Sequence, residues 1–81
     1  MSVPIERPVS AQLATARLIL GQFEEQLREW RRMGVKRRQR TVRGRDLGQR
    51  LDGLKAGHAK WTQRVAELED RLAVESSEDH G

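Results

Sequence analysis

The residues of this chain with the clearest chemical potential are the cations of one ten-residue run, KRRQRTVRGR at positions 36–45. This run holds six Lys or Arg residues and no acid. Between Arg28 and Arg50 there are ten cations and two acids, a net charge of +8, whereas the whole chain carries +4. The remaining positions are therefore acidic overall, and the positive charge is concentrated in one stretch.

Cations at this density can contact several phosphate groups at once. Nine of the ten are arginine, and the planar guanidinium forms paired hydrogen bonds with phosphate and stacks on bases. Such contacts bind a nucleic-acid backbone without reading its sequence. The residues that we expect to bind nucleic acid, RNA or DNA, or else an acidic partner, are Arg32, Lys36, Arg37, Arg38, Arg40, Arg43 and Arg45.

Other functions of a basic segment stay open. It can dock on an acidic protein surface, or it can remain solvated and keep like-charged molecules apart. The run has no Phe, Tyr or Trp for base stacking, and no helix-turn-helix or zinc-finger spacing predicts base-specific reading. We expect a small accessory or regulatory protein that binds nucleic acid non-specifically. The alternative is a protein-interaction adaptor or inhibitor that docks on an acidic partner through the basic end or an apolar helix face.

Catalytic and metal chemistry find little support. The chain has no cysteine, and its two histidines, His58 and His80, lack the spacing of metal ligands. No hydroxyl side chain has the histidine and carboxylate neighbours of an activated nucleophile. We therefore expect a protein that is not an enzyme, with no metal, cofactor or small-molecule substrate. No segment approaches the roughly 20 apolar residues of a membrane span, and residues 1–8 do not resemble a signal peptide, so we expect a cytoplasmic location.

Two heptad patterns flank the basic run and predict the elements that carry it. The first has its seam positions at Val9, Leu13, Ala16, Leu20, Phe23, Leu27, Trp30 and Gly34. The second has them at Leu47, Leu51, Leu54, His58, Trp61, Val65, Leu68 and Leu72. Alternating spacings of three and four are the period of a coiled-coil seam. We therefore expect an all-α fold with helices at about 9–33 and 46–74 and a basic loop at 34–45.

Local signals predict where these helices begin and end. Pro8 or Ser10 is expected to start the first helix, and Gly34 to end it in a left-handed cap. Asp46 lies three residues before Gln49, as in a capping box, and is expected to start the second helix. Outside the helices we expect a flexible segment at 1–8 and an acidic, disordered tail at 75–81.

The two heptads are in register for antiparallel packing. Residues paired in this way have numbers with a constant sum, here 81, as in Leu27 with Leu54 and Phe23 with His58. The simplest interpretation is a helical hairpin of coiled-coil type. Because any two strict heptads permit some such pairing, a parallel or intermolecular arrangement is the alternative.

A lone hairpin of 81 residues leaves much of each helix exposed to water, so a second layer is expected. Dimerisation into a four-helix bundle would supply it. The residues that we expect at the dimer interface are Ala14, Leu18, Ile19, Ala59, Ala66 and Ala73. Alternatively, the alanines are good helix formers on a solvated face. A short dimeric hairpin is similar in outline to the Rop-type RNA-binding bundles, with no diagnostic motif in common.

Three seam residues other than the aliphatic ones are candidates for a further role. His58 faces Phe23 in the expected register, where a histidine can fix register, act as a protonation switch or be a tolerated polar core residue. Trp30 and Trp61 lie on the seam of their helices, so core packing is favoured over contact with a ligand.

Overall fold

Three helices account for most of residues 7–78, the part of the chain that the computed structural model describes. In chain order they are α1 (Val9–Arg32), α2 (Val35–Arg40) and α3 (Val42–Glu78). No strand occurs within the described range. The prediction of an all-α protein is confirmed.

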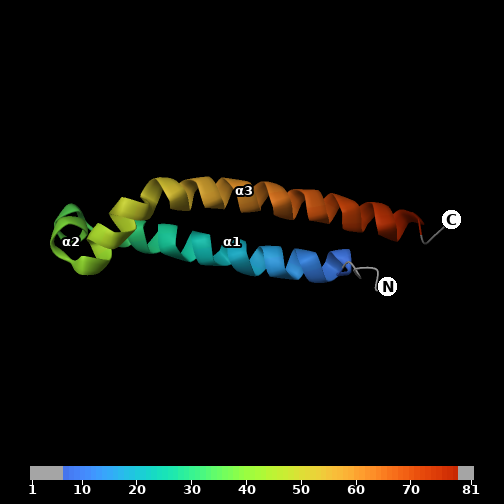
Figure 1. Ribbon diagram of the computed structural model, residues 1–81, viewed down its shortest axis with the longest axis horizontal. Coiled ribbons are helices and arrows are strands. Elements are labelled where there is room, and N and C mark those ends of the chain that lie inside the picture. The colour runs from blue at the N-terminus through green and yellow to red at the C-terminus, as the bar shows by residue number, and fades with distance from the viewer. Residues whose placement is uncertain (1–6, 79–81) are drawn as a thin grey trace, which may run out of the picture.

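The helices α1 and α3 lie side by side and run in opposite directions, as Figure 1 shows. The short helix α2 lies across the far end of this pair and packs against the beginning of α3. The molecule extends 59 Å along its longest axis, so it is a rod with α2 at one end and the termini at the other.

The interface between α1 and α3 buries two groups of side chains. The terminal cluster, toward the chain ends, consists of Leu13, Ala16, Val65 and Leu68. The α2-side cluster consists of Leu27, Leu47 and Leu54. Within residues 7–78, every buried hydrophobic side chain occupies a position of one of the two heptads. The periodicity of the sequence therefore predicts which side of each helix is buried.

Between the two clusters, the ring of Phe23 packs against Gly57, the residue next to its expected partner His58. A Cβ atom added to Gly57 would overlap the ring of Phe23. The ring therefore occupies the space beside Gly57, which only a residue without a side chain leaves open. His58 lies at the edge of the interface instead, 36% exposed, with its Nε2 3.7 Å from Oε2 of Glu24.

The prediction of a loop at 34–45 is wrong, because α2 and the first residues of α3 occupy most of this segment. Gly34 has φ −71° and ψ 164°, an extended conformation that precedes α2, and it does not form a left-handed cap. Thr41 separates α2 from α3. Its Oγ1 accepts a hydrogen bond of 3.0 Å from the N–H of Gly44 and donates one to the carbonyl of Arg37. Thr41 thus satisfies a free donor at the start of α3, as an N-cap does.

Asp46 is not the cap that the sequence predicted. It lies inside α3, where its Oδ2 is 3.2 Å from Nη1 of Arg50 and 3.9 Å from Nη1 of Arg43. Because Thr41 already caps the helix, the carboxylate of Asp46 is available for these cations. At the N-terminus, α1 begins directly after Pro8, one of the two expected starts, and the N–H of Gln12 donates to the Pro8 carbonyl at 3.0 Å.

The C-terminal end of α3 differs from the expectation as well. The helix continues to Glu78, so residues 75–78 of the expected disordered tail are helical. The rest of that tail, at 79–81, and positions 1–6 of the expected flexible segment lie outside the described residues. Among the described residues, no helix combines the length and the apolar content needed to cross a bilayer.

Candidate nucleic-acid interface

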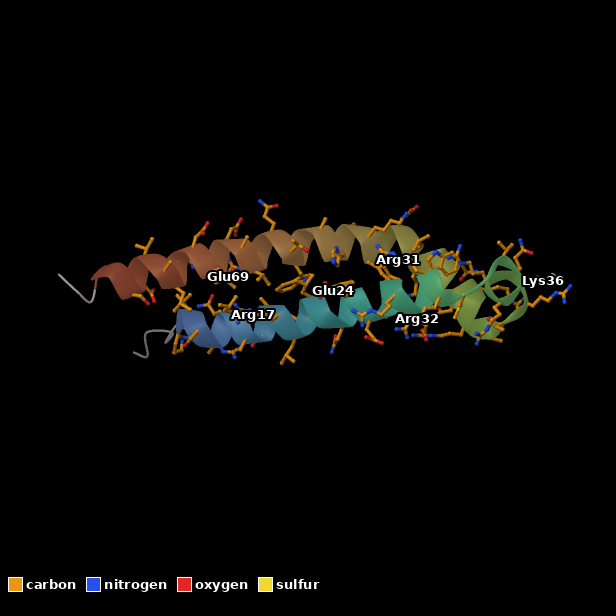
Figure 2. All side chains as sticks on the ribbon, turned by 180° about the vertical axis from the view of Figure 1, so that it is seen from behind. Arg17, Glu24, Arg31, Arg32, Lys36 and Glu69 are labelled. Carbon is orange, nitrogen blue, oxygen red and sulfur yellow. The ribbon has the colours of Figure 1, made fainter. Side chains whose placement is uncertain are left out.

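Residues 28–50 form one end of the rod, which we call the basic end. It comprises the last turns of α1, all of α2 and the first turns of α3. In Figure 2, Lys36 lies at the extreme tip, with Arg31 and Arg32 on α1 behind it, and Arg17 and Glu69 far along the rod. The fold therefore gathers the ten cations of this segment at one end of the molecule.

Arg38 holds α2 against the end of α1. Its Nε and Nη2 donate hydrogen bonds of 3.2 and 2.9 Å to the backbone carbonyl of Trp30. The guanidinium carbon lies 4.2 Å from the centre of the Trp30 ring, within the range of a cation–π interaction. The Trp30 carbonyl also accepts a hydrogen bond of 3.1 Å from the N–H of Met33, so Arg38 adds to the bonding of a carbonyl at the end of the helix, where backbone partners are few. Arg38, which the sequence suggested for partner binding, is thus engaged within the fold.

Gly44 fixes the close approach of α2 to α3. It is buried, and a Cβ atom at this position would lie 2.5 Å from the carbonyl oxygen of Arg37 and 2.6 Å from the Cα of Arg38. These are backbone atoms that cannot move aside without moving α2. The sharp angle between the two helices therefore requires a glycine here.

Three further cations of the basic end are paired with carboxylates. Arg43 Nε lies 2.8 Å from Oε2 of Glu29, which joins the start of α3 to α1. Arg28 pairs with Glu25 at 3.0 Å, and Arg50 with Asp46 as described above. Arg43 was also predicted to bind a partner, but its charge is largely balanced within the molecule.

The remaining six cations have no partner within residues 7–78, neither an ion pair nor a side-chain hydrogen bond. They are Arg31, Arg32, Lys36, Arg37, Arg40 and Arg45. All of them are exposed. Arg31 is the one member that the predicted site omitted, although its position beside the seam residue Trp30 could have indicated an exposed side chain. We call this set the free cations.

An open cavity of about 500 Å³ lies between α1, α2 and the beginning of α3. Two of the free cations, Arg32 and Arg37, line it, together with the paired residues Arg43 and Glu29. The basic end is therefore a concave surface where side chains from different helices face a common space. Within the described residues, no group of three or more His, Asp or Glu side chains could hold a metal ion.

The residues expected at a dimer interface do not all lie on one side of the helix pair. Ala14 and Ala66 are three residues before Arg17 and Glu69, whose side chains face each other at 3.5 Å across one edge. Residues three apart are neighbours on a helix surface, so the alanines lie next to this edge, which faces the viewer in Figure 2.

Ile19 lies on the opposite edge. It is seven residues from Gln12 and from Gln26, which hydrogen-bond Arg64 and Arg50 there. Leu18 is 72% exposed on the outer side of α1, and Ala59 and Ala73 are exposed at one-heptad intervals from Ala66. A single partner surface can cover the alanines and Leu18, but not Ile19.

Comparisons of the chain with models of protein families, with curated proteins and with solved structures found no match. Function is therefore inferred from the charges and the shape of the basic end.

Proposed function

We propose that this protein is a small non-enzymatic accessory or regulatory protein that binds the backbone of duplex or structured nucleic acid through its basic end. The observation that carries the proposal is the set of six exposed cations that have no partner in the described part of the chain. A phosphate that contacts these residues replaces water and counterions, and every ion pair of the fold stays intact. Release of counterions then supplies most of the binding free energy.

The other half of the rod supports an end-on orientation. Toward the chain ends, α3 exposes Glu67, Glu69, Asp70 and Glu75, and these carboxylates repel phosphates. A nucleic acid that approaches the rod along its side would meet both signs of charge in similar numbers, whereas one that approaches the basic end meets ten cations and two acids. The charge distribution therefore favours contact through the basic end.

An acidic protein partner is the second candidate, and one observation favours it. Val35 and Val42 are 66% and 78% exposed; Val35 is the first residue of α2 and Val42 the first of α3, and both lie among the free cations. Apolar side chains beside arginine are typical of protein interfaces, and they add little to contacts with phosphate. The mixed surface would suit an acidic protein whose apolar side chains meet these valines.

We also propose that the coiled-coil hairpin dimerises into a four-helix bundle. Only seven hydrophobic side chains are buried within the described residues, a small core for a stable monomer. The exposed residues Ala59, Ala66 and Ala73 are one heptad apart, and small side chains permit close approach of another helix. A second hairpin on this side would bury this row together with Ala14.

Sedimentation at micromolar concentration tests the assembly. We expect the mass of a dimer for the unmodified protein and of a monomer for Ala66→Arg, because a long charged side chain prevents close approach. Gln22→Arg, at an exposed position of α1 three residues from Ile19 on the other edge, is the matched control and should leave the dimer intact. A monomer mass for the unmodified protein, with its helicity retained, would refute the dimer.

The binding proposal is tested by removing charge at two places. Lys36, Arg40 and Arg45 are changed together to Gln in one variant. In the other, Lys55, Lys60 and Arg71 are changed to Gln; these are exposed cations elsewhere on α3 that form no ion pair among the described residues. Both variants lose three charges. Affinity for labelled duplex RNA and DNA is measured over a range of salt concentrations.

We expect the first variant to bind more weakly and its slope of log K against log salt to be shallower by about one unit for each phosphate that it no longer binds. The control should keep the slope of the unmodified protein. Equal weakening in both variants would mean that net charge alone governs binding. No detectable binding by the unmodified protein at low salt would reject nucleic acid and favour the acidic protein partner.

A further inference from the structure

The cavity of the basic end has a feature that the proposed function does not require. Of the residues that line it, Arg32 comes from the last turn of α1 and Arg37 from α2. Phosphate contacts spread over an exposed surface need no cavity. Here, two arginines from different helices instead line one concave space of about 500 Å³, which lies within the usual range of roughly 300–1,000 Å³ for small-ligand sites.

The carboxylates of the cavity do not neutralise these two arginines. Glu29 is 2.8 Å from Arg43, and Glu25 is 3.0 Å from Arg28. Each carboxylate thus already has a cation of its own, and Arg32 and Arg37 have none within the described residues. An anion that enters the cavity would contact both guanidiniums without breaking an ion pair.

The position of α2 relative to α1 is fixed by contacts within the protein. Arg38 hydrogen-bonds the Trp30 carbonyl, and Gly44 brings the backbone of α3 against α2. The Thr41 hydroxyl donates to the carbonyl of Arg37 itself. The backbones that carry Arg32 and Arg37 are therefore held in place before a ligand arrives, which lowers the entropic cost of binding.

The chemistry of the cavity suits one class of ligand. Arginine binds phosphate through two parallel hydrogen bonds. Met33, half-buried, supplies an apolar contact on the same cavity, which suits the carbon face of a sugar. The lining thus combines cations for a phosphate with an apolar surface for the group attached to it.

We propose that this cavity is a phosphate-binding site in which Arg32 and Arg37 hold a single phosphate group of a nucleotide unit. The identity of the ligand rests on the proposed function, because nucleic acid is the source of the phosphate. The group is either a phosphodiester within the strand or a phosphomonoester at its 5′ end. The other free cations contact neighbouring phosphates without a defined site.

The test compares four single variants that each remove one charge. Arg32→Gln and Arg37→Gln alter the cavity; Arg31→Gln and Arg40→Gln alter free cations that do not line it. Binding of 5′-phosphorylated and 5′-hydroxyl RNA duplexes is measured at one salt concentration, after circular dichroism has shown equal helicity. We expect binding to weaken about tenfold for each cavity variant, as when a charge-assisted hydrogen-bond pair is removed, and less than about threefold for each control.

The two duplexes distinguish the sources of the phosphate. Tighter binding of the 5′-phosphorylated duplex, with the preference abolished in Arg32→Gln, assigns the site to a terminal phosphate. Equal binding of both duplexes, with the weakening confined to the cavity variants, assigns it to an internal phosphodiester. Equal weakening in all four variants would overturn the proposal, because the cavity would then act only through its charge.

A titration with pyrophosphate separates this site from the proposed function. The Nε–Hε signals of Arg32 and Arg37 in nitrogen-15 NMR spectra should shift in a saturable way, and those of Arg31 and Arg40 should shift weakly. This result supports the site even for a protein that binds no nucleic acid. Uniform, non-saturating shifts of all four signals would overturn it, even for a protein that binds duplexes tightly.

Discussion

The two halves of the rod are stabilised by different means. In the terminal half, Leu13 and Ala16 pack against Val65 and Leu68, and exposed ion pairs such as Arg17–Glu69 lie at the edge. At the basic end, the positions of the helices also depend on two single residues. Arg38 hydrogen-bonds the end of α1, and Gly44 lets the backbone of α2 pack directly against α3. A repeated apolar pattern specifies the first half, and the second half needs single residues in addition to that pattern.

This difference divides the charged residues of the basic end by what they do. Arg38 and Arg43 hold α2 and α3 against α1, so their charges are engaged within the molecule. The free cations have no such contacts in the described part of the chain. The net charge of the basic end therefore overstates the number of cations that a partner can contact, because only the free cations are available for binding.

The largest expected effect is that of truncating a leucine in either half. Leu47 and Leu68 are the two largest fully buried side chains, and each change to Ala should lower the free energy of unfolding by about 2–5 kcal/mol. Chemical denaturation followed by circular dichroism measures this change. Val74→Ala, at a site 57% exposed and outside the expected dimer interface, is the control and should change stability by less than about 0.5 kcal/mol. A small effect of Leu47→Ala alone would mean that the basic end adds little to the stability of the core.

Gly44→Ala should lower the free energy of unfolding by about 1–3 kcal/mol, the usual cost of overpacking. The added methyl group would meet backbone atoms of α2, so α2 must move away from α3. Gly53→Ala is the control: nothing lies within 4 Å of its Cβ position, and alanine there should stabilise the helix by about 0.5–1 kcal/mol. If the two variants were equally stable, the close contact between α2 and α3 would not exist in solution.

Arg38→Gln should cost about 1–2 kcal/mol, because it removes hydrogen bonds to the Trp30 carbonyl and the contact with the indole ring. In a Trp61→Phe background, the fluorescence of Trp30 should also shift to longer wavelength as the ring becomes more exposed. Arg40→Gln, which removes the same charge at an exposed site without partners, should change neither property. An unaltered Trp30 spectrum in Arg38→Gln would contradict the contact.

The smallest expected effect is that of His58→Leu, which should change the free energy of unfolding by less than about 1 kcal/mol. The heptad predicts a histidine in the core, where it would lower the free energy of unfolding, so that its replacement by leucine would stabilise the protein. The structure has it at the edge beside Glu24, 36% exposed, where the substitution changes little. A rise in the free energy of unfolding of more than about 2 kcal/mol would instead mean that His58 is buried in the core.

Sequence periodicity predicted the buried sides of α1 and α3, because the Leu and Val side chains at these positions are removed from water only between the two helices. It did not predict that the ring of Phe23 packs against Gly57, because this contact is a property of the pair that neither helix shows alone. It failed at 34–45, where abundant charge and glycine indicated a loop. That segment is held in helical form by Thr41 and by the contact of Arg38 with Trp30, eight residues away.

The candidate site was predicted in composition but not in detail. The density of arginine identified the basic end correctly, and five of the seven residues named from the sequence are free cations. The other two, Arg38 and Arg43, are indistinguishable from their neighbours in the sequence, because their partners Trp30 and Glu29 come close only in the folded chain. The cavity likewise depends on the position of α2, which no local pattern indicates.

The most direct test of the account is an NMR titration of the nitrogen-15-labelled protein with a short RNA duplex. We expect the backbone amide signals of residues 31–45 to shift, those of the terminal half of α1 and α3 to stay unchanged, and the shifts to disappear as salt is raised. Shifts centred on the terminal half, or shifts at the basic end that persist at high salt, would contradict binding of the nucleic-acid backbone through the free cations.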